Sequence, residues 1–356
     1  MRHEQARYHF IAYYHQQMDI DAQPGTPITT AGAPFNDPTD NVDLVIRTAD
    51  NVEFFVLSVL LTLRSPSSFF RHALQDSKHT EERNGLPVLE VTEDSATFRT
   101  ILLLCYPDAA PKIKSVKRFQ AVGVGLEKYC MDRAMGRFVQ AVLASSMISE
   151  QPLRVFALAV ANGWKKLGEA AARNTLVLPL RQAISDVEEL NIITARHLYR
   201  LQDYHARCGE AAQIQAGEAM EHPWLNGKTS GLTFLQRQSQ CQWCSRRLDY
   251  VMCEETESIL GEGQLETNYI YGHPWLSDTY FRLVNAKVLL EPRPQVALDD
   301  HIVDQAVLAS TKQCNSAHHD KWTSIAGSQI HLLGKILAEE IERRISEVPL
   351  DIEWQK

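Results

Sequence analysis

The residues best suited to chemistry are cysteines and histidines in the second half of the chain. Cys241 and Cys244 have the C-x2-C spacing at which two thiolates can grip one zinc ion. His205 and Cys208 lie three residues apart, so on a helix they would share one face and could supply two more ligands. Alternative partners for the close pair are Cys253, Cys314 and His318.

A simpler interpretation competes with this structural zinc site. A single C-x2-C pair without a second one is a weak zinc pattern. Cysteines in helices are commonly small apolar core residues. We therefore expect plain thiols, an ordinary helix histidine at position 205, and no cofactor. A zinc ion held by Cys241, Cys244, His205 and Cys208 would stabilise the region and would not imply catalysis.

Patterns typical of enzymes are incomplete in this sequence. Residues 226–229 (NGKT) resemble the end of a P-loop, but the required earlier glycine position is His222. Gly123 and Gly125 begin a dinucleotide-binding pattern that lacks its third glycine and falls within an expected helix. The sequence has no G-x-S-x-G and no H-E-x-x-H motif. We expect no enzymatic activity.

Charge and composition narrow the class of partner. A net charge of −8 argues against a general nucleic-acid binder, which needs a basic face. The one tight basic cluster is interpreted as a solvated helix face: Lys112, Lys114, Lys117 and Arg118. No apolar run approaches the roughly 18 residues of a membrane helix, and the N-terminus lacks the apolar stretch of a secretory signal. Seven cysteines without disulfide-like spacing favour an intracellular protein, in the cytoplasm or the nucleus. From the charge and the apolar runs we expect no direct nucleic-acid partner and no membrane partner.

The elements that must position any site are clearest between Asp43 and Cys105. Residues 44–46 and 52–56 predict two strands, and the turn residues 49–51 join them as a hairpin. Helical spacing begins at Leu57, and Ser65-Pro66 predicts the start of a second short helix.

A polar segment and further regular elements follow. Residues 75–86 read as an exposed loop and residues 88–91 as a third strand. Asp94 can cap a helix that Pro107 stops. Two more helices are expected, from Ser115 and up to about residue 145.

The rest of the chain is expected to be helical, with no further convincing strand. The expected organisation is a tail at 1–35, an α+β domain at 36–145, a helical extension at 146–220, a loop-rich segment at 221–277 and C-terminal helices at 278–356. Thr194 can cap a long helix. The tetrapeptide HPWL occurs at His222 and again at His273, as coincidence or as two similar helix entries. An apolar stripe along the last helix (Ile330, Leu333, Leu337, Ile341, Ile345) favours core packing over a coiled-coil seam.

The order strand–strand–helix–helix–strand–helix–helix–helix, filled with these residues, resembles a BTB/POZ domain. The matching segments are NDPTDNVDLVIRTADNVEFFV, LTLRSPSSFFRHAL, GLPVLEVTEDSATFRTILLLCYP and LEKYCMDRAM, with weaker likeness in PLRVFALAVANGW, LYRLQDYHARCGEAA and EIERRISEVPL. The likeness is greatest to fungal, especially basidiomycete, BTB proteins. It implies a small mixed sheet packed on a helical cluster that commonly self-associates and recruits other proteins.

The resemblance also has limits that bear on function. Asp43 matches the family's characteristic aspartate, but Leu57 stands where the family usually has histidine. The apolar-x-Glu motif of cullin-binding members is not matched by QDSKHTEE after Leu74. We therefore expect a non-catalytic interaction scaffold, a homodimer through this domain, rather than the alternative, a substrate adaptor of a cullin-type ubiquitin ligase. The residues expected at its interfaces are Asp43, Leu44, Leu57, Leu61, Phe69 and Leu74.

Overall fold

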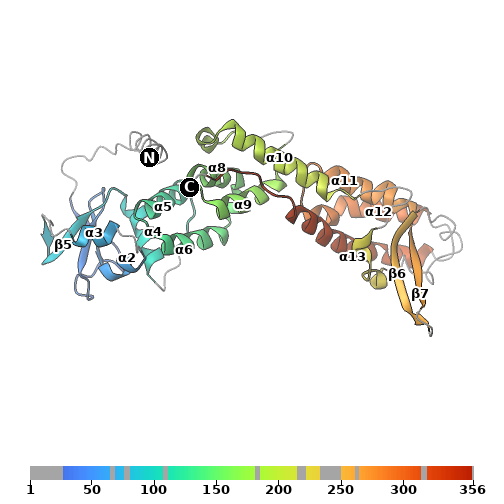
Figure 1. Ribbon diagram of the computed structural model, residues 1–356, viewed down its shortest axis with the longest axis horizontal. Coiled ribbons are helices and arrows are strands. Elements are labelled where there is room, and N and C mark those ends of the chain that lie inside the picture. The colour runs from blue at the N-terminus through green and yellow to red at the C-terminus, as the bar shows by residue number, and fades with distance from the viewer. Residues whose placement is uncertain are drawn as a thin grey trace. The chain divides into compact units, whose positions relative to one another are not determined.

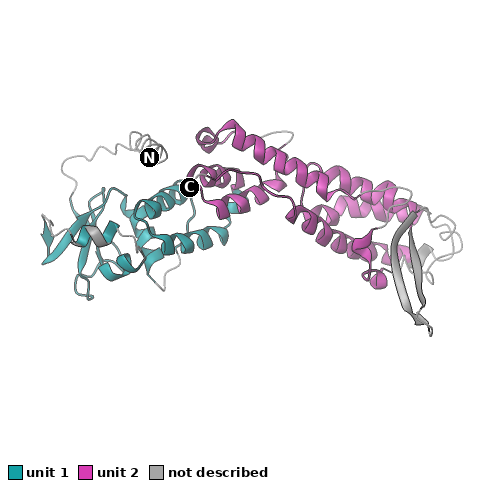
Figure 2. Cartoon of the chain, in the orientation of Figure 1, with its two compact units in different colours: residues 1–150 teal, residues 151–356 magenta. Residues whose placement is uncertain are grey.

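The structure is a computed structural model that describes part of the chain and divides it into two compact units. The described residues are 27–64, 69–75, 81–106, 111–180, 185–214, 222–232, 250–260, 264–313 and 319–354. Unit 1 comprises residues 1–150 and unit 2 residues 151–356 (Figure 2). The expected segments 146–220, 221–277 and 278–356 thus fall almost entirely in unit 2. Among the helices described, none combines the length and apolar character needed to cross a membrane.

Unit 1 is built on a small mixed sheet of five strands (Figure 1). The strands are β1 (Thr29–Thr30), β2 (Leu44–Arg47), β3 (Val52–Val56), β4 (Glu82–Arg83) and β5 (Leu86–Glu90), in the spatial order β1-β3-β2-β5-β4. β2 and β3 form the expected antiparallel hairpin, and β5 adds to β2 in parallel. The three expected strands are therefore confirmed, and two short edge strands, β1 and β4, complete the sheet.

Both turns of the sheet depend on residues that tolerate a left-handed backbone. Asn51, between β2 and β3, has φ +59°. Asn84 and Gly85, between β4 and β5, have φ +55° and +75°. Two consecutive positive φ values are typical of the tight hairpin turn favoured by Asn-Gly. The segment expected as an exposed loop therefore contains a hairpin in its described part.

Alternation along β2 and β3 gives the sheet two different faces. Ile46 lies opposite Phe54 in the register, and both side chains are fully buried. Val45 and Phe55 belong to the other face, where they form a second small core with Val88. This double burial explains why both strands read as nearly continuous apolar runs.

A buried ion network lies next to that second core. Arg47 and Glu53 are directly opposite in the register, and their side chains are 8% and 1% exposed. Arg47 Nη2 lies 2.8 Å from Glu53 Oε1 and 2.6 Å from Glu81 Oε1. Glu53 Oε2 has no hydrogen bond, but Arg83 Nε lies 3.3 Å away as an ion partner. The two arginines thus compensate a buried carboxylate.

Helices pack on one another and on this sheet. They are α2 (Ser58–Arg64), α3 (Phe69–Gln75), α4 (Ser95–Cys105), α5 (Val116–Lys128), α6 (Asp132–Leu143) and α7 (Met147–Glu150). Asp94 caps α4 as expected and accepts a hydrogen bond from Thr97 N. The helix expected from about Ser115 is α5, and Ser115 caps it by accepting a hydrogen bond from Arg118 N. Phe98 of α4 packs against Phe54 of β3, with ring centroids 6.2 Å apart.

Residues 27–35 pack in unit 1, which corrects this part of the expected tail at 1–35; residues 1–26 lie outside the described residues. β1 pairs in parallel with β3. Phe35 is fully buried and its ring packs edge-on against Tyr106. Arg99 also donates hydrogen bonds to the carbonyls of Gly32 and Ala33. The Pro/Gly-rich composition of this part favoured a tail, because Phe35 is its one aromatic residue and gives only a weak sign of packing.

Unit 2 is mainly helical. Its elements are α8 (Pro152–Asn162), α9 (Lys165–Asn174), η1 (Thr175–Val177), η2 (Glu188–Ile192), α10 (Ala195–Ala212), η3 (Pro223–Leu225), η4 (Thr229–Gly231), β6 (Tyr250–Leu260), β7 (Gln264–Gly272), η8 (Leu276–Phe281), α11 (Arg282–Val288), η9 (Pro294–Leu298), α12 (Asp300–Gln313) and α13 (His319–Ser346). Thr194 caps α10 through a capping box with His197. The apolar stripe of α13 is buried, as expected for core packing.

The expectation of no further strand was wrong. β6 and β7 pair as an antiparallel hairpin within the segment expected to be loop-rich. Glutamates at 254, 255 and 257 interrupt the apolar alternation of β6 in the sequence, so the pattern was too weak to predict a strand.

The two HPWL tetrapeptides share one backbone hydrogen bond but belong to different helices, a short 3-10 helix (η3) and the π-helix η8. In each, the leucine N–H donates to the histidine carbonyl, at 2.8 Å for Leu225 to His222 and 2.9 Å for Leu276 to His273. Each histidine is also buried. Both copies therefore begin a helical turn, but only the second continues into a longer helix.

Candidate protein-interaction site

Asp43, the aspartate that matches the resemblance, positions the first helix. Its Oδ1 accepts a hydrogen bond from Ser58 N at 2.7 Å, and its Oδ2 accepts one from Ser58 Oγ at 2.6 Å. Ser58 is the first residue of α2, whose N-terminal N–H groups lack partners within the helix. Asp43 therefore fixes the start of α2 to the beginning of β2, which is a structural role.

Asp50 makes the same arrangement at α4, and the sequence reasoning missed it. Its carboxylate accepts hydrogen bonds from Ser95 N at 2.9 Å and Ser95 Oγ at 2.6 Å. Burial alone would raise the pKa of Asp50, but hydrogen bonds from Ser95 and Thr48 outweigh it and hold the pKa below its ordinary value. The sequence marked Asp50 only as a turn residue, and its partner Ser95 lies 45 residues further along the chain.

The apolar residues expected at the interface differ in how far they are buried. Leu44 and Leu61 are fully buried in the core of unit 1. Leu57 and Leu74 are partly buried. Phe69 is 40% exposed. Of these five leucine and phenylalanine side chains, Phe69 presents the most surface to a partner in this conformation.

Two further exposed apolar side chains lie on α2. Val59 is 49% and Leu63 56% exposed, and their spacing of four residues places them on one helix face. α2 is apolar almost all round, since Val59, Leu60, Leu61 and Leu63 occupy four of its seven positions. Only one side of the helix packs in the core, so apolar residues on its other sides were the sign in the sequence that some of them are exposed. We call Val59, Leu63 and Phe69 the exposed apolar set.

Phe69 is supported from below by aromatic rings. Its ring lies 5.2 Å from that of Phe70 and 5.0 Å from that of Tyr129. Tyr129 is buried and hydrogen-bonds to Glu93. Burial, followed by the negative charge of Glu93, raises the pKa of Tyr129, so the phenol stays neutral. The ring of Phe69 therefore packs against two other aromatic rings, as is typical of an aromatic contact residue.

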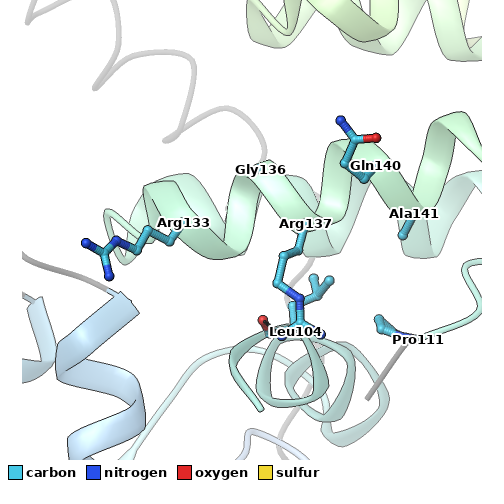
Figure 3. A pocket seen from close by; sticks show the side chains of 7 residues that line it. All are labelled: Leu104, Pro111, Arg133, Gly136, Arg137, Gln140 and Ala141. Atoms are coloured by element: carbon cyan, nitrogen blue, oxygen red, sulfur yellow. Dashed lines mark hydrogen bonds between the residues drawn. The ribbon is translucent and has the colours of Figure 1, made fainter. Parts of the chain in front are cut away.

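A shallow groove of about 470 Å³ opens between α6 and the end of α4 (Figure 3). Its lining residues are Leu104, Pro111, Arg133, Gly136, Arg137, Gln140 and Ala141. Space remains open above Gly136, where an added Cβ would meet no atom within 4 Å. The floor is mainly apolar and open to solvent.

Arg137 closes one side of the groove by capping α4. Its Nη1 donates hydrogen bonds to the carbonyls of Leu104 at 2.8 Å and Tyr106 at 2.6 Å. A cation at a helix C-terminus is favoured by the helix dipole and satisfies carbonyls without intrahelical partners. A binding site for a small molecule normally encloses most of its ligand. This groove is more open than such a site.

The candidate metal ligands are not assembled in the part of the chain that is described. Within those residues, no group of three or more His, Cys, Asp or Glu side chains could hold a metal ion. His205 Nε2 lies 2.9 Å from the carbonyl oxygen of Leu178. Burial, partly offset by Tyr204, raises the pKa of the Cys208 thiol to about 11, so it is protonated at neutral pH. Cys241 and Cys244 lie outside the described residues.

Comparison with known proteins identified no family for this chain. No protein-family model matches the chain, and no curated protein matches it.

Proposed function

We propose that this chain is a non-catalytic protein-interaction protein whose unit 1 is a BTB/POZ-type domain that self-associates and recruits other proteins. The observation that carries the proposal is the exposed apolar set on α2 and α3, two short helices that follow the expected hairpin β2–β3. Apolar side chains that gather on one exposed surface are typical of protein-interaction sites.

The sheet topology supports the family resemblance. An antiparallel hairpin β2–β3, two short helices and a strand β5 parallel to β2 follow in the order that the resemblance implies. The fungal assignment rests on the quoted sequence segments alone.

Self-association through a second copy is the simplest use of the apolar set. A twofold interface is formed by the same surface of both copies, so one patch suffices. A stable interface buries about 800 Å² on each side, so more of unit 1 than three side chains would take part. The apolar set would form its centre.

Sedimentation velocity of the full chain tests this use. Leu63→Glu places a charge within the apolar set, and Leu308→Glu on α12 is a matched control because Leu308 is 50% exposed. We expect Leu63→Glu to weaken self-association by at least about tenfold, from desolvating one charge, and Leu308→Glu to leave it unchanged. Equal behaviour of the two variants would remove the role proposed for α2.

The adaptor alternative has its own test. Purified cullin scaffold is mixed with the full chain, and the complex is weighed by light scattering. Stoichiometric capture would favour the adaptor function over the scaffold.

A further inference from the structure

The segment that follows α13 packs onto two other helices of unit 2. Residues 347–354 extend from the end of α13, and Trp354 reaches α9 at Gly168. A Cβ added at Gly168 would overlap the six-membered ring of Trp354. The indole therefore lies directly on the backbone of α9.

Gly168 has no backbone reason to be glycine. It lies inside α9 (Lys165–Asn174) and its φ is not in the left-handed region. Glycine in a helix interior lowers helix stability relative to alanine. The close approach of the Trp354 ring explains why position 168 is glycine.

Two arginines of α10 hold the acidic residues of the same segment. Arg207 Nη2 lies 3.0 Å from Asp351 Oδ2 and donates to the carbonyl of Pro349 at 2.9 Å. Arg196 Nη2 lies 2.9 Å from Glu353 Oε1. Between these acidic residues Ile352 is 9% exposed.

This mode of attachment is that of a bound peptide. The described hydrogen bonds from α10 to residues 349–354 come from arginine side chains. The exposed ion pairs give specificity, and the two apolar anchors Ile352 and Trp354 give contact area. A segment held in this way can be exchanged for another of the same chemistry without unfolding a helix.

We propose that Gly168, Arg196 and Arg207 form a peptide-binding site that residues 349–354 fill in cis. The competing ligand is a segment of a partner protein with the same chemistry: two acidic residues flanking an apolar one, followed by an aromatic anchor. Tethering gives the chain's own segment a high effective concentration, so the site opens only to a partner that binds well. The proposal concerns unit 2 and stands or falls independently of self-association through unit 1.

A synthetic peptide of residues 347–356 with a fluorescent label is the probe. Its fluorescence anisotropy is measured with the unaltered full chain and with the full-length Trp354→Ala variant. In the variant the space that the indole occupies beside Gly168 is empty. We expect saturable binding to the variant and at least about tenfold weaker binding to the unaltered chain, because the tethered segment competes. Absence of saturable binding to Trp354→Ala, or equal binding to both proteins, would overturn the proposal.

Two controls separate the site from general stickiness. A peptide with Asp351→Lys and Glu353→Lys should bind at least about tenfold more weakly, as should a Trp354→Ala chain that also carries Arg207→Glu. Hydrogen exchange gives a test that does not depend on Trp354→Ala. Gly168→Leu occupies the indole seat, so exchange in residues 349–354 should become at least about tenfold faster. Unchanged exchange would mean that the segment is not held there.

Exchange between copies is a distinguishable outcome. If the segment crosses to a second molecule, Trp354→Ala lowers the molecular mass measured by light scattering. That result would overturn occupation in cis.

Discussion

Replacing Arg47 by leucine tests whether the buried ion network determines the stability of unit 1. The Glu53 side chain is 1% exposed, and Arg47 is its 2.8 Å partner. Arg47→Leu leaves the Glu53 charge buried with only Arg83, which is 51% exposed and 3.3 Å away. Breaking a buried ion pair on one side costs about 3–5 kcal/mol. That loss is a large fraction of the roughly 5–15 kcal/mol of a typical domain.

The distribution of tryptophans makes the assay specific for one unit. All six follow residue 150: Trp164, Trp224, Trp243, Trp275, Trp322 and Trp354. Tryptophan emission in a urea titration therefore reports unit 2, whereas far-ultraviolet circular dichroism reports both units. We expect Arg47→Leu to move the dichroism transition of unit 1 to lower urea and to leave the tryptophan transition in place.

A double variant separates pair-breaking from loss of the arginine itself. In Arg47→Leu/Glu53→Leu no charge remains buried, and replacing both partners by apolar residues is often neutral or stabilising. We expect it to recover most of the stability lost in the single variant. A loss below about 1 kcal/mol in the single variant, the value of an exposed pair, would refute the reasoning. Equal losses in both variants would also refute it.

Four other substitutions test individual contacts. In α13, Gly334→Ala should lower the stability of unit 2, because the new Cβ would lie 2.7 Å from the carbonyl oxygen of Ala297. A Cβ at Gly327 would meet no atom within 4 Å, so Gly327→Ala should raise the stability of unit 2 by about 0.5–1 kcal/mol. Both changes are measured by tryptophan emission in a urea titration. Asp43→Ala should cost unit 1 about 1 kcal/mol by removing the cap of α2, measured by dichroism; an unchanged midpoint would contradict that role. Burial, and then the charge of Arg344, lowers the pKa of His222 to about 4, below its ordinary value of about 6.5. The unfolded chain then binds a proton first, so unit 2 should lose up to about 3 kcal/mol as the pH falls from 6.5 to 4, and His222→Phe should flatten that part of the pH profile.

The parts of the fold that could be predicted were those encoded by local chemistry. Asn51 permits the β2–β3 turn, and Asp94, Ser115 and Thr194 cap the helices that follow them. These signals lie within a few residues of the structure they determine. The apolar runs of β2 and β3 indicated strands for the same reason.

The parts that could not be predicted depend on contacts between distant residues. Arg47 and Glu53 would be placed at the surface by their charge, and only the sheet register makes them a buried pair. Val59 and Leu63 were not singled out in the sequence, since nothing local shows which side of α2 faces solvent. The contact of Trp354 with Gly168 joins residues far apart in the chain, so neither predicts the other.

The molecular mass of the full chain in solution tests the central claim most directly. The chain has a mass of 40.3 kDa. Light scattering across a range of concentrations should give twice that mass at the upper end and fall toward the single-chain value on dilution. A mass of 40.3 kDa at every concentration would contradict self-association through unit 1.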